Sequence, residues 1–159
     1  MTILFRGLHS QGRKSAPIPD DAGEVSVQKF SYTFAASTGM GVGDIIEIGE
    51  LPQGCSVVDV VLIPDDMDTG AALTHDVGIM SGVFGAPDAT RTCDNVFIAG
   101  SVAARTGVIQ RMSAPGGFRV APDPNQVRGI GIKCTAAAAG IPATAMTIDL
   151  LVSYCPSTV

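Results

Sequence analysis

Asp66 and Asp68 stand where their side chains could bind a metal ion in this 159-residue chain. The segment Asp66-Met67-Asp68-Thr69-Gly70 has the alternating carboxylates and the glycine of the first half of a calcium-binding loop. No glutamate follows at the position of the bidentate ligand in such a loop. Asp66 and Asp68 are thus the candidate metal ligands, but the broken pattern favours a solvated turn whose aspartates bind their own backbone.

The two histidines, His9 and His75, are the candidates for acid–base catalysis. His75 lies in an alternating segment that is typical of a strand, where its neighbour Asp76 points to the opposite face. The two side chains therefore cannot serve one nucleophile, and we expect a packed or interface histidine at position 75. The glycines at 39, 41 and 43 precede neither a helix nor the lysine of a phosphate-binding loop. We predict that the chain is not an enzyme and has no cofactor.

The four cysteines are far apart in the chain, at positions 55, 93, 134 and 155. They form no C-x-x-C pair and have no histidine cluster nearby, so a zinc site is disfavoured. We expect small, buried, reduced side chains. Disulfides are the alternative if the protein matures in an oxidising medium.

The elements that must position these residues are short strands. The chain has 19 glycines and 10 prolines, which indicates many turns and no long helix. Residues 57–63 are rich in β-branched side chains, and residues 73–81 alternate with period two. With the acidic turn between them, the two runs predict an antiparallel pair.

Two further segments carry the alternation that marks a buried face. In residues 144–155, the predicted core face holds Met146, Ile148, Leu150, Val152 and Tyr154. In residues 25–36, Val25 and Val27 have the opposite parity to Phe30, Tyr32 and Phe34, so we predict a bulge near Gln28 and Lys29 that would bring both sets to one face.

The pattern as a whole predicts an all-β fold, a jelly-roll-like β-sandwich with an extended N-terminal arm. About eight to ten strands at roughly 10-residue spacing, with no strong helix and no repeat, are typical of such a sandwich. We assign residues 1–24 to the arm and residues 25–159 to a single β-sandwich domain.

The arm combines apolar and basic residues and has no acidic residue before Asp20. Disordered tails seldom keep such apolar residues, so the composition favours an arm that becomes ordered on another subunit over a free tail. The residues that we expect to contact a partner protein or a sister subunit are Ile3, Leu4, Phe5, Arg6, Leu8, Arg13 and Lys14.

Charge and hydropathy exclude several kinds of partner. The net charge is −5, which opposes a groove for nucleic-acid phosphates. The sequence has no run of 18 apolar residues that could span a membrane. Its first residues make a poor signal peptide because the apolar residues precede the charges. We expect no nucleic-acid partner, no membrane partner and folding in the cytoplasm.

Several strand-and-turn motifs resemble a family of small virion proteins of phages, encoded beside the major capsid protein. The similar residues are Leu51-Pro52-Gln53-Gly54, the strands at 57–62 and 73–82 with the acidic turn between them, and the segments 95–101 and 129–133. Among such proteins, the cement protein of the short-tailed Bordetella phage type is the one that this chain looks like.

The resemblance implies a structural role. It implies a jelly-roll cement or decoration protein on the outside of an icosahedral head, tying major capsid subunits together. The implied partners are the major capsid protein and the chain itself, as a homodimer or homotrimer. The implied location is the virion exterior after assembly in the host cytoplasm. No catalytic residue carries over from this family.

Two alternatives stay open. A carbohydrate-binding jelly roll or head-fibre module would need exposed aromatic rings, but the chain has no Trp, and both Tyr32 and Tyr154 are predicted to face the core. A small cupin-like enzyme would need several histidines and a carboxylate in a barrel, and His9 with His75 scarcely supply them.

Overall fold

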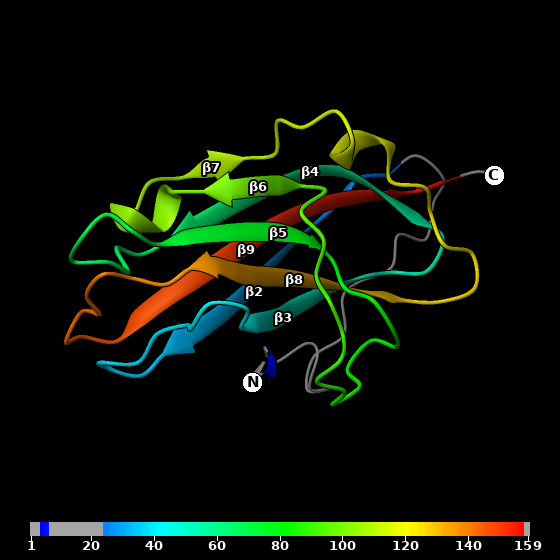
Figure 1. Ribbon diagram of the computed structural model, residues 1–159. Helices are drawn as coiled ribbons and strands as arrows, with labels where there is room; N and C mark the ends of the chain where they lie inside the picture. The colour runs from blue at the N-terminus through cyan, green and yellow to red at the C-terminus, as the bar shows by residue number, and fades with distance from the viewer. Residues whose placement is uncertain (1–3, 7–23, 158–159) are drawn as a thin grey trace.

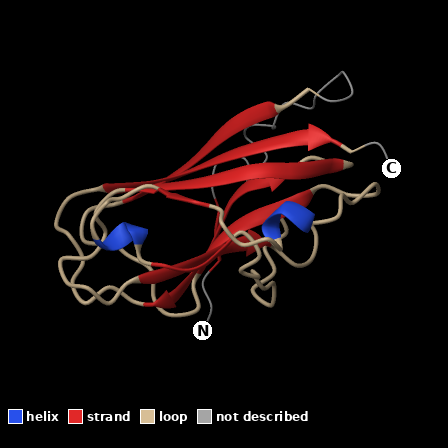
Figure 2. Ribbon diagram, turned by 90° about the horizontal axis from the view of Figure 1, so that it is seen from above, coloured by secondary structure: helices blue, strands red, loops and turns tan. Residues whose placement is uncertain are grey.

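The protein is a sandwich of two β-sheets, seen from the front in Figure 1 and from above in Figure 2. This computed structural model describes residues 4–6 and 24–157. The front sheet holds, in spatial order, β3 (Ile45–Leu51), β8 (Arg128–Ala136), β5 (Thr74–Ile79) and β6 (Ile98–Ser101). The back sheet holds β2 (Ser26–Phe34), β9 (Met146–Pro156), β4 (Cys55–Pro64) and β7 (Gln110–Arg111). Two short 3-10 turns, η1 (Ala103–Arg105) and η2 (Gly117–Arg119), lie in the connections.

The strand order is that of a jelly roll. The first of these eight strands pairs with the last, β2 with β9, and the pairing continues inward as β3 with β8, β4 with β7 and β5 with β6. Such nested antiparallel pairs form one long hairpin, and rolling that hairpin up produces the additional β4–β9 and β5–β8 pairs. The predicted fold class is therefore confirmed.

Residues 4–6 add a ninth strand at the β3 edge of the front sheet. This strand, β1 (Leu4–Arg6), runs parallel to β3, with Leu4 opposite Ile45 and Arg6 opposite Glu47. All the other pairs of named strands in the described part of the chain are antiparallel. The β1 strand thus extends the sheet outside the nested hairpin pattern.

The core lies between the two sheets and is built by strict alternation. The predicted core face of β9 is confirmed, because Met146, Ile148, Leu150, Val152 and Tyr154 are all buried. Ile130 and Ile132 of β8 meet them from the front sheet within one hydrophobic cluster. Tyr32 packs against the same cluster and is partly buried. The two tyrosines are thus engaged with the core, as the sequence predicts.

Two local predictions are wrong. Residues 57–63 and 73–81 do not pair with each other, because β4 lies in the back sheet and β5 in the front sheet. The acidic segment between them therefore crosses from one sheet to the other. The predicted bulge at Gln28 is absent from β2, which pairs with β9 without a register shift, so Val27 faces outward and is 54% exposed. The bulge lies instead at Val58 of β4.

The outer face of the front sheet is covered by the long β5–β6 connection, residues 80–97, which crosses in front of the strands in Figure 1. Glycines make this close approach possible. A Cβ atom on Gly78 would collide with the backbone and side chain of Asp94, and one on Gly131 with the sulfur atoms of Met80 and Cys93. Alternation of glycine with isoleucine in β8 thus gives one face to the core and the other to this connection.

A buried ion pair fixes the connection on the sheet. Glu47 of β3 is fully buried, and Arg91 of the connection is 4% exposed. The guanidinium donates two hydrogen bonds to the Glu47 carboxylate and one to the backbone carbonyl of Ser81, while Gly85 donates its N–H to Glu47. Pairing in two parallel hydrogen bonds is the strong geometry for these two groups. It anchors residues 81–91 to β3.

Candidate interaction surface

His75 is buried in the core. Its side chain has no exposed surface, and neither ring nitrogen has a hydrogen-bond partner among the described residues. Burial lowers the pKa of His75 to about 4, although Asp76 partly opposes that shift. The imidazole is therefore neutral at physiological pH, and it packs in the core as the sequence predicts.

Asp68 is the second buried polar side chain in this region, with 2% of its surface exposed. Its carboxylate accepts hydrogen bonds from five backbone N–H groups, those of Gly70, Ala72, Leu73, Ala139 and Gly140. Burial alone would raise the pKa of the Asp68 carboxyl, but hydrogen bonds from the backbone, led by that of Leu73, hold the pKa well below its usual range. The carboxylate is charged and surrounded by donors.

This environment differs from that of a metal ligand. N–H groups present the positive ends of their dipoles, which stabilise an anion and repel a cation. Asp66 accepts one long hydrogen bond, 3.3 Å, from the N–H of Asp68, as in the predicted backbone-binding turn. No group of three histidine, cysteine, aspartate or glutamate side chains with metal-binding geometry occurs among the described residues.

Asp68 instead ties together the loops at one end of the sandwich. Four connections meet there, at the left of Figure 1: residues 35–44, 65–73, 102–109 and 137–145, which we call the four-loop end. Asp68 joins the second of these loops to the fourth. The N–H of Met67 donates to Ala104, and Arg105 donates to the carbonyl of Leu73, which joins the second loop to the third. Ser37 donates to Pro142 and joins the first to the fourth.

The four-loop end is also where apolar side chains reach solvent. Ten large apolar side chains in the described part of the chain are exposed, and half of them lie on these loops. They are Val42, Val102, Val108, Ile109 and Ile141, with exposed fractions between 45% and 69%. The loops at the opposite end expose Val83 and Phe118. Exposed apolar side chains concentrated in one place mark an interaction site more often than scattered ones do.

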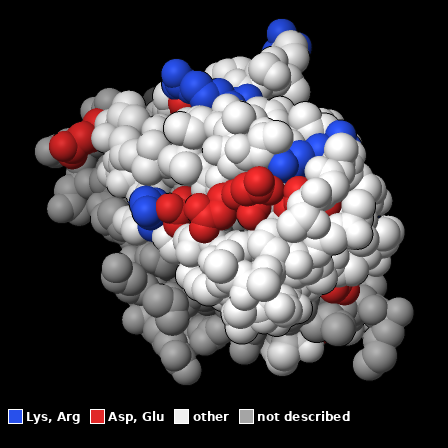
Figure 3. Space-filling view, turned by 90° about the vertical axis from the view of Figure 1, so that its left-hand side faces the viewer, with Lys and Arg blue, Asp and Glu red and all other residues white. Residues whose placement is uncertain are grey.

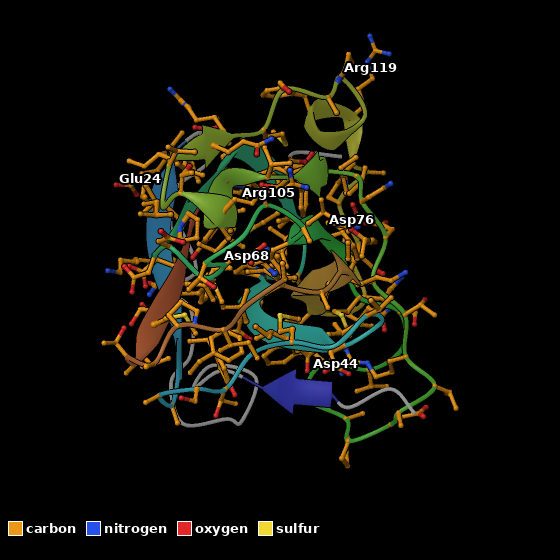
Figure 4. The ribbon with its side chains drawn as sticks, turned by 60° about the vertical axis from the view of Figure 1, so that its left-hand side comes forward. Glu24, Asp44, Asp68, Asp76, Arg105 and Arg119 are labelled. Atoms are coloured by element: carbon orange, nitrogen blue, oxygen red, sulfur yellow. The ribbon has the colours of Figure 1, made fainter. Side chains whose placement is uncertain are left out.

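Charge is sparse on the four-loop end. Figure 3 looks at this end and shows a surface that is mostly uncharged, with acidic side chains gathered near its middle and basic side chains to either side of them. The exposed charged residues on the four loops are Asp65 and Asp66. Arg105 is half-buried, and its guanidinium donates to the carbonyls of Leu73 and Ala72. In Figure 4, Asp68 lies at the centre of the loops below Arg105, while Arg119 projects at the margin.

Sequence reasoning missed these apolar residues, although a signal for them exists. Val42 stands between two glycines, Val108 and Ile109 follow a glycine, and Ile141 stands between a glycine and a proline. Large apolar residues inside turn segments have no strand face to bury them. Their presence in the loops could have indicated the surface.

The predicted arm contacts lie mostly outside the described residues. Ile3, Leu8, Arg13 and Lys14 are outside them, and of Leu4, Phe5 and Arg6 the structure describes the backbone as strand β1. Residues 1–24 therefore stay a predicted contact segment.

The cysteines are free thiols, and three of the four are buried. Cys155 is partly exposed. Burial raises the pKa of the Cys93 thiol to about 12, so that thiol is protonated and unreactive at neutral pH.

Among the described residues, no helix has the length and apolar character needed to cross a membrane.

Comparison with known proteins finds similar chains in solved capsid structures. The chain is 36% identical to a chain in the structure of the capsid of Ralstonia phage GP4, covering 98% of this chain and 99% of that one with a TM-score of 0.88. A chain of the cyanophage Pam1 capsid asymmetric unit shares the fold, at 22% identity and a TM-score of 0.63, over 93% of this chain and 96% of that one. No protein-family model and no curated protein matches.

Substitution of Asp68 tests its role as the link between loops. D68N keeps the size of the side chain but places an amide donor against backbone donors, so we expect it to lower the free energy of unfolding by at least about 3 kcal/mol. D66N, which affects one long hydrogen bond, should cost less than about 1 kcal/mol. Urea denaturation at neutral pH measures both values. Equal losses in the two variants would contradict the assigned role of Asp68.

Acidification tests the buried state of His75. The unfolded chain binds a proton at His75 below a pKa of about 6.5, whereas the folded chain does so only below about 4, so stability falls as pH falls through this window. We expect a loss of about 2 kcal/mol between about pH 7.5 and pH 5. H75L should lose less by that amount, because leucine does not titrate. Urea titrations of both proteins at the two pH values check this, and identical pH dependence would refute it.

Proposed function

We propose that this chain is a structural protein of a phage capsid. The observation behind the proposal is that the chain belongs to one family with the chain in the Ralstonia phage GP4 capsid. The 36% identity extends over nearly the whole of both chains, so it covers the sandwich, the loops and the N-terminal segment alike. The relative is thus a protein of about the same length, and it is found in a phage capsid.

Within that setting, we propose the narrower role of a cement or decoration protein on the outer surface of the head. The rolled hairpin is a closed unit with its own core, so the chain can fold before it meets a shell. A protein that binds only the assembled shell stabilises that shell by mass action, and repeated copies raise the effective concentration at each site. The major capsid protein is the proposed partner, and the virion exterior is the proposed location.

Self-association and the arm complete the proposal. We expect a homodimer or homotrimer, because a low charged fraction of 16% leaves wide uncharged faces to share. The arm residues, Ile3 to Lys14, offer apolar and basic groups to the shell or to a sister subunit. Part of this segment, Leu4–Arg6, is the edge strand β1, which pairs with β3 of the same chain.

The test of the proposed role is binding to shells assembled without this protein. Purified protein should co-sediment with shells from the phage that encodes it, saturate them, and raise their melting temperature. It should bind free capsid subunits at least about tenfold more weakly, since a cement protein bridges neighbours that only the shell brings together. Absence of co-sedimentation would exclude the role, and equal affinity for free subunits would exclude the bridging part of it.

Deletion of residues 1–15 tests the arm. The buried core of the described chain begins at Phe30, and the edge strand β1 is the one described element that the deletion removes, so the sandwich should stay folded. Shell occupancy should fall and become more sensitive to salt, because apolar anchors and basic groups are lost together. Gel densitometry of shells, with thermal melting of the free protein as the control, measures both effects. Full and salt-resistant occupancy by the truncated protein would show that the arm makes no contact.

A further inference from the structure

The four-loop end carries features that the core and the fold do not require. Five large apolar side chains on its loops are between 45% and 69% exposed. Exposure of apolar surface to water is unfavourable, and a group of such side chains marks a surface that binds a partner. The same loops hold two exposed charged residues, Asp65 and Asp66. An apolar surface with a small number of like charges is complementary to an apolar partner that carries a basic side chain.

The loops are held in place before any partner arrives. Asp68 binds backbone groups of two loops, the Met67 and Arg105 hydrogen bonds fix a third, and the Ser37 hydrogen bond fixes the fourth. Surfaces that are already ordered lose little conformational entropy on binding. The apolar residues therefore stand on a preorganised platform.

The two aspartates differ in how far they are used by the fold. Asp65 accepts a hydrogen bond of 2.6 Å from the N–H of Thr147, whereas Asp66 accepts one of 3.3 Å from the N–H of Asp68. Both aspartates are exposed. The Asp66 carboxylate has the greater capacity left for a cation on a partner.

We propose that the four-loop end is the face that docks on the capsid shell, against an apolar patch of the major capsid protein with a basic side chain opposite Asp66. This inference rests on the proposed cement role and adds the contact face and its chemistry. The opposite end, with its exposed Asp88, Asp94 and Arg119, then points away from the shell.

Paired substitutions at the two ends test the assignment. I109K with I141K places charges on the four-loop end, and V83K with F118K places the same charges on the opposite end at side chains that are 69% and 54% exposed. We expect the first pair to weaken binding to shells at least about tenfold, and the second pair to stay within about twofold of the unaltered protein. I109S with I141S is the milder version, and all variants are first checked by thermal melting.

The charge is tested separately with D66K and D66N. D66K should weaken shell binding more than D66N, and the unaltered protein should bind less tightly as salt rises, because both effects follow from a basic group opposite Asp66. Equal binding by D66K and the unaltered protein would overturn the basic partner group.

The outcomes separate the inference from the proposed function. If the unaltered protein does not bind shells, the proposed function fails and the inference falls with it. If it binds, and I109K/I141K binds equally well or V83K/F118K is the pair that loses binding, the docking face is wrong while the function stands. If I109K/I141K only converts an oligomer to a monomer in sedimentation, with shell binding unchanged, the four-loop end is a contact between copies and the inference is overturned.

Discussion

The carboxylate of Asp68 is the interaction on which the four-loop end depends. It lies in the loop that carries the chain from the back sheet to the front sheet, and it binds the loop that carries the chain back again. A buried charge is costly unless hydrogen bonds surround it, and five backbone donors do so here. Because Asp68 accepts their hydrogen bonds, these backbone N–H groups need no partner in a helix or a sheet. Irregular loops can therefore pack closely together.

The features of the fold that could be predicted from the sequence are those that depend on residues close together in the chain. The core face of β9 and the all-β class are local properties, since alternation along one strand decides them. The partner of a strand is not local: residues 57–63 and 73–81 look like a hairpin, but they lie in different sheets because β4 pairs with β9 and β5 with β8. Asp68 looked like part of a solvated turn because two of its donors are about 70 positions further along the chain.

The glycines of β8 show a signal of the intermediate kind. The run Gly129-Ile130-Gly131-Ile132 predicts a strand with one apolar face, and the structure confirms that Ile130 and Ile132 enter the core. Glycine on the other face is unusual for solvent, where a β-branched or polar residue suits a strand better. The reason is the connection at 80–97, which lies so close that a Cβ atom would collide with it. Such a pattern can indicate a covered face but not what covers it.

The two ends of the sandwich hold their loops by different chemistry, and the difference bears on function. The long connection is held by Glu47 and Arg91, a buried pair whose charges satisfy each other. Replacing such a pair by apolar residues is often neutral for stability. What the geometry shows is that the pair, with the Gly85 N–H, holds the connection at one position on β3. At the four-loop end, a single anion is satisfied by backbone groups, and the exposed apolar side chains take no part in these hydrogen bonds. The fold therefore does not require apolar residues at the exposed positions of those loops, whereas contact with a partner would.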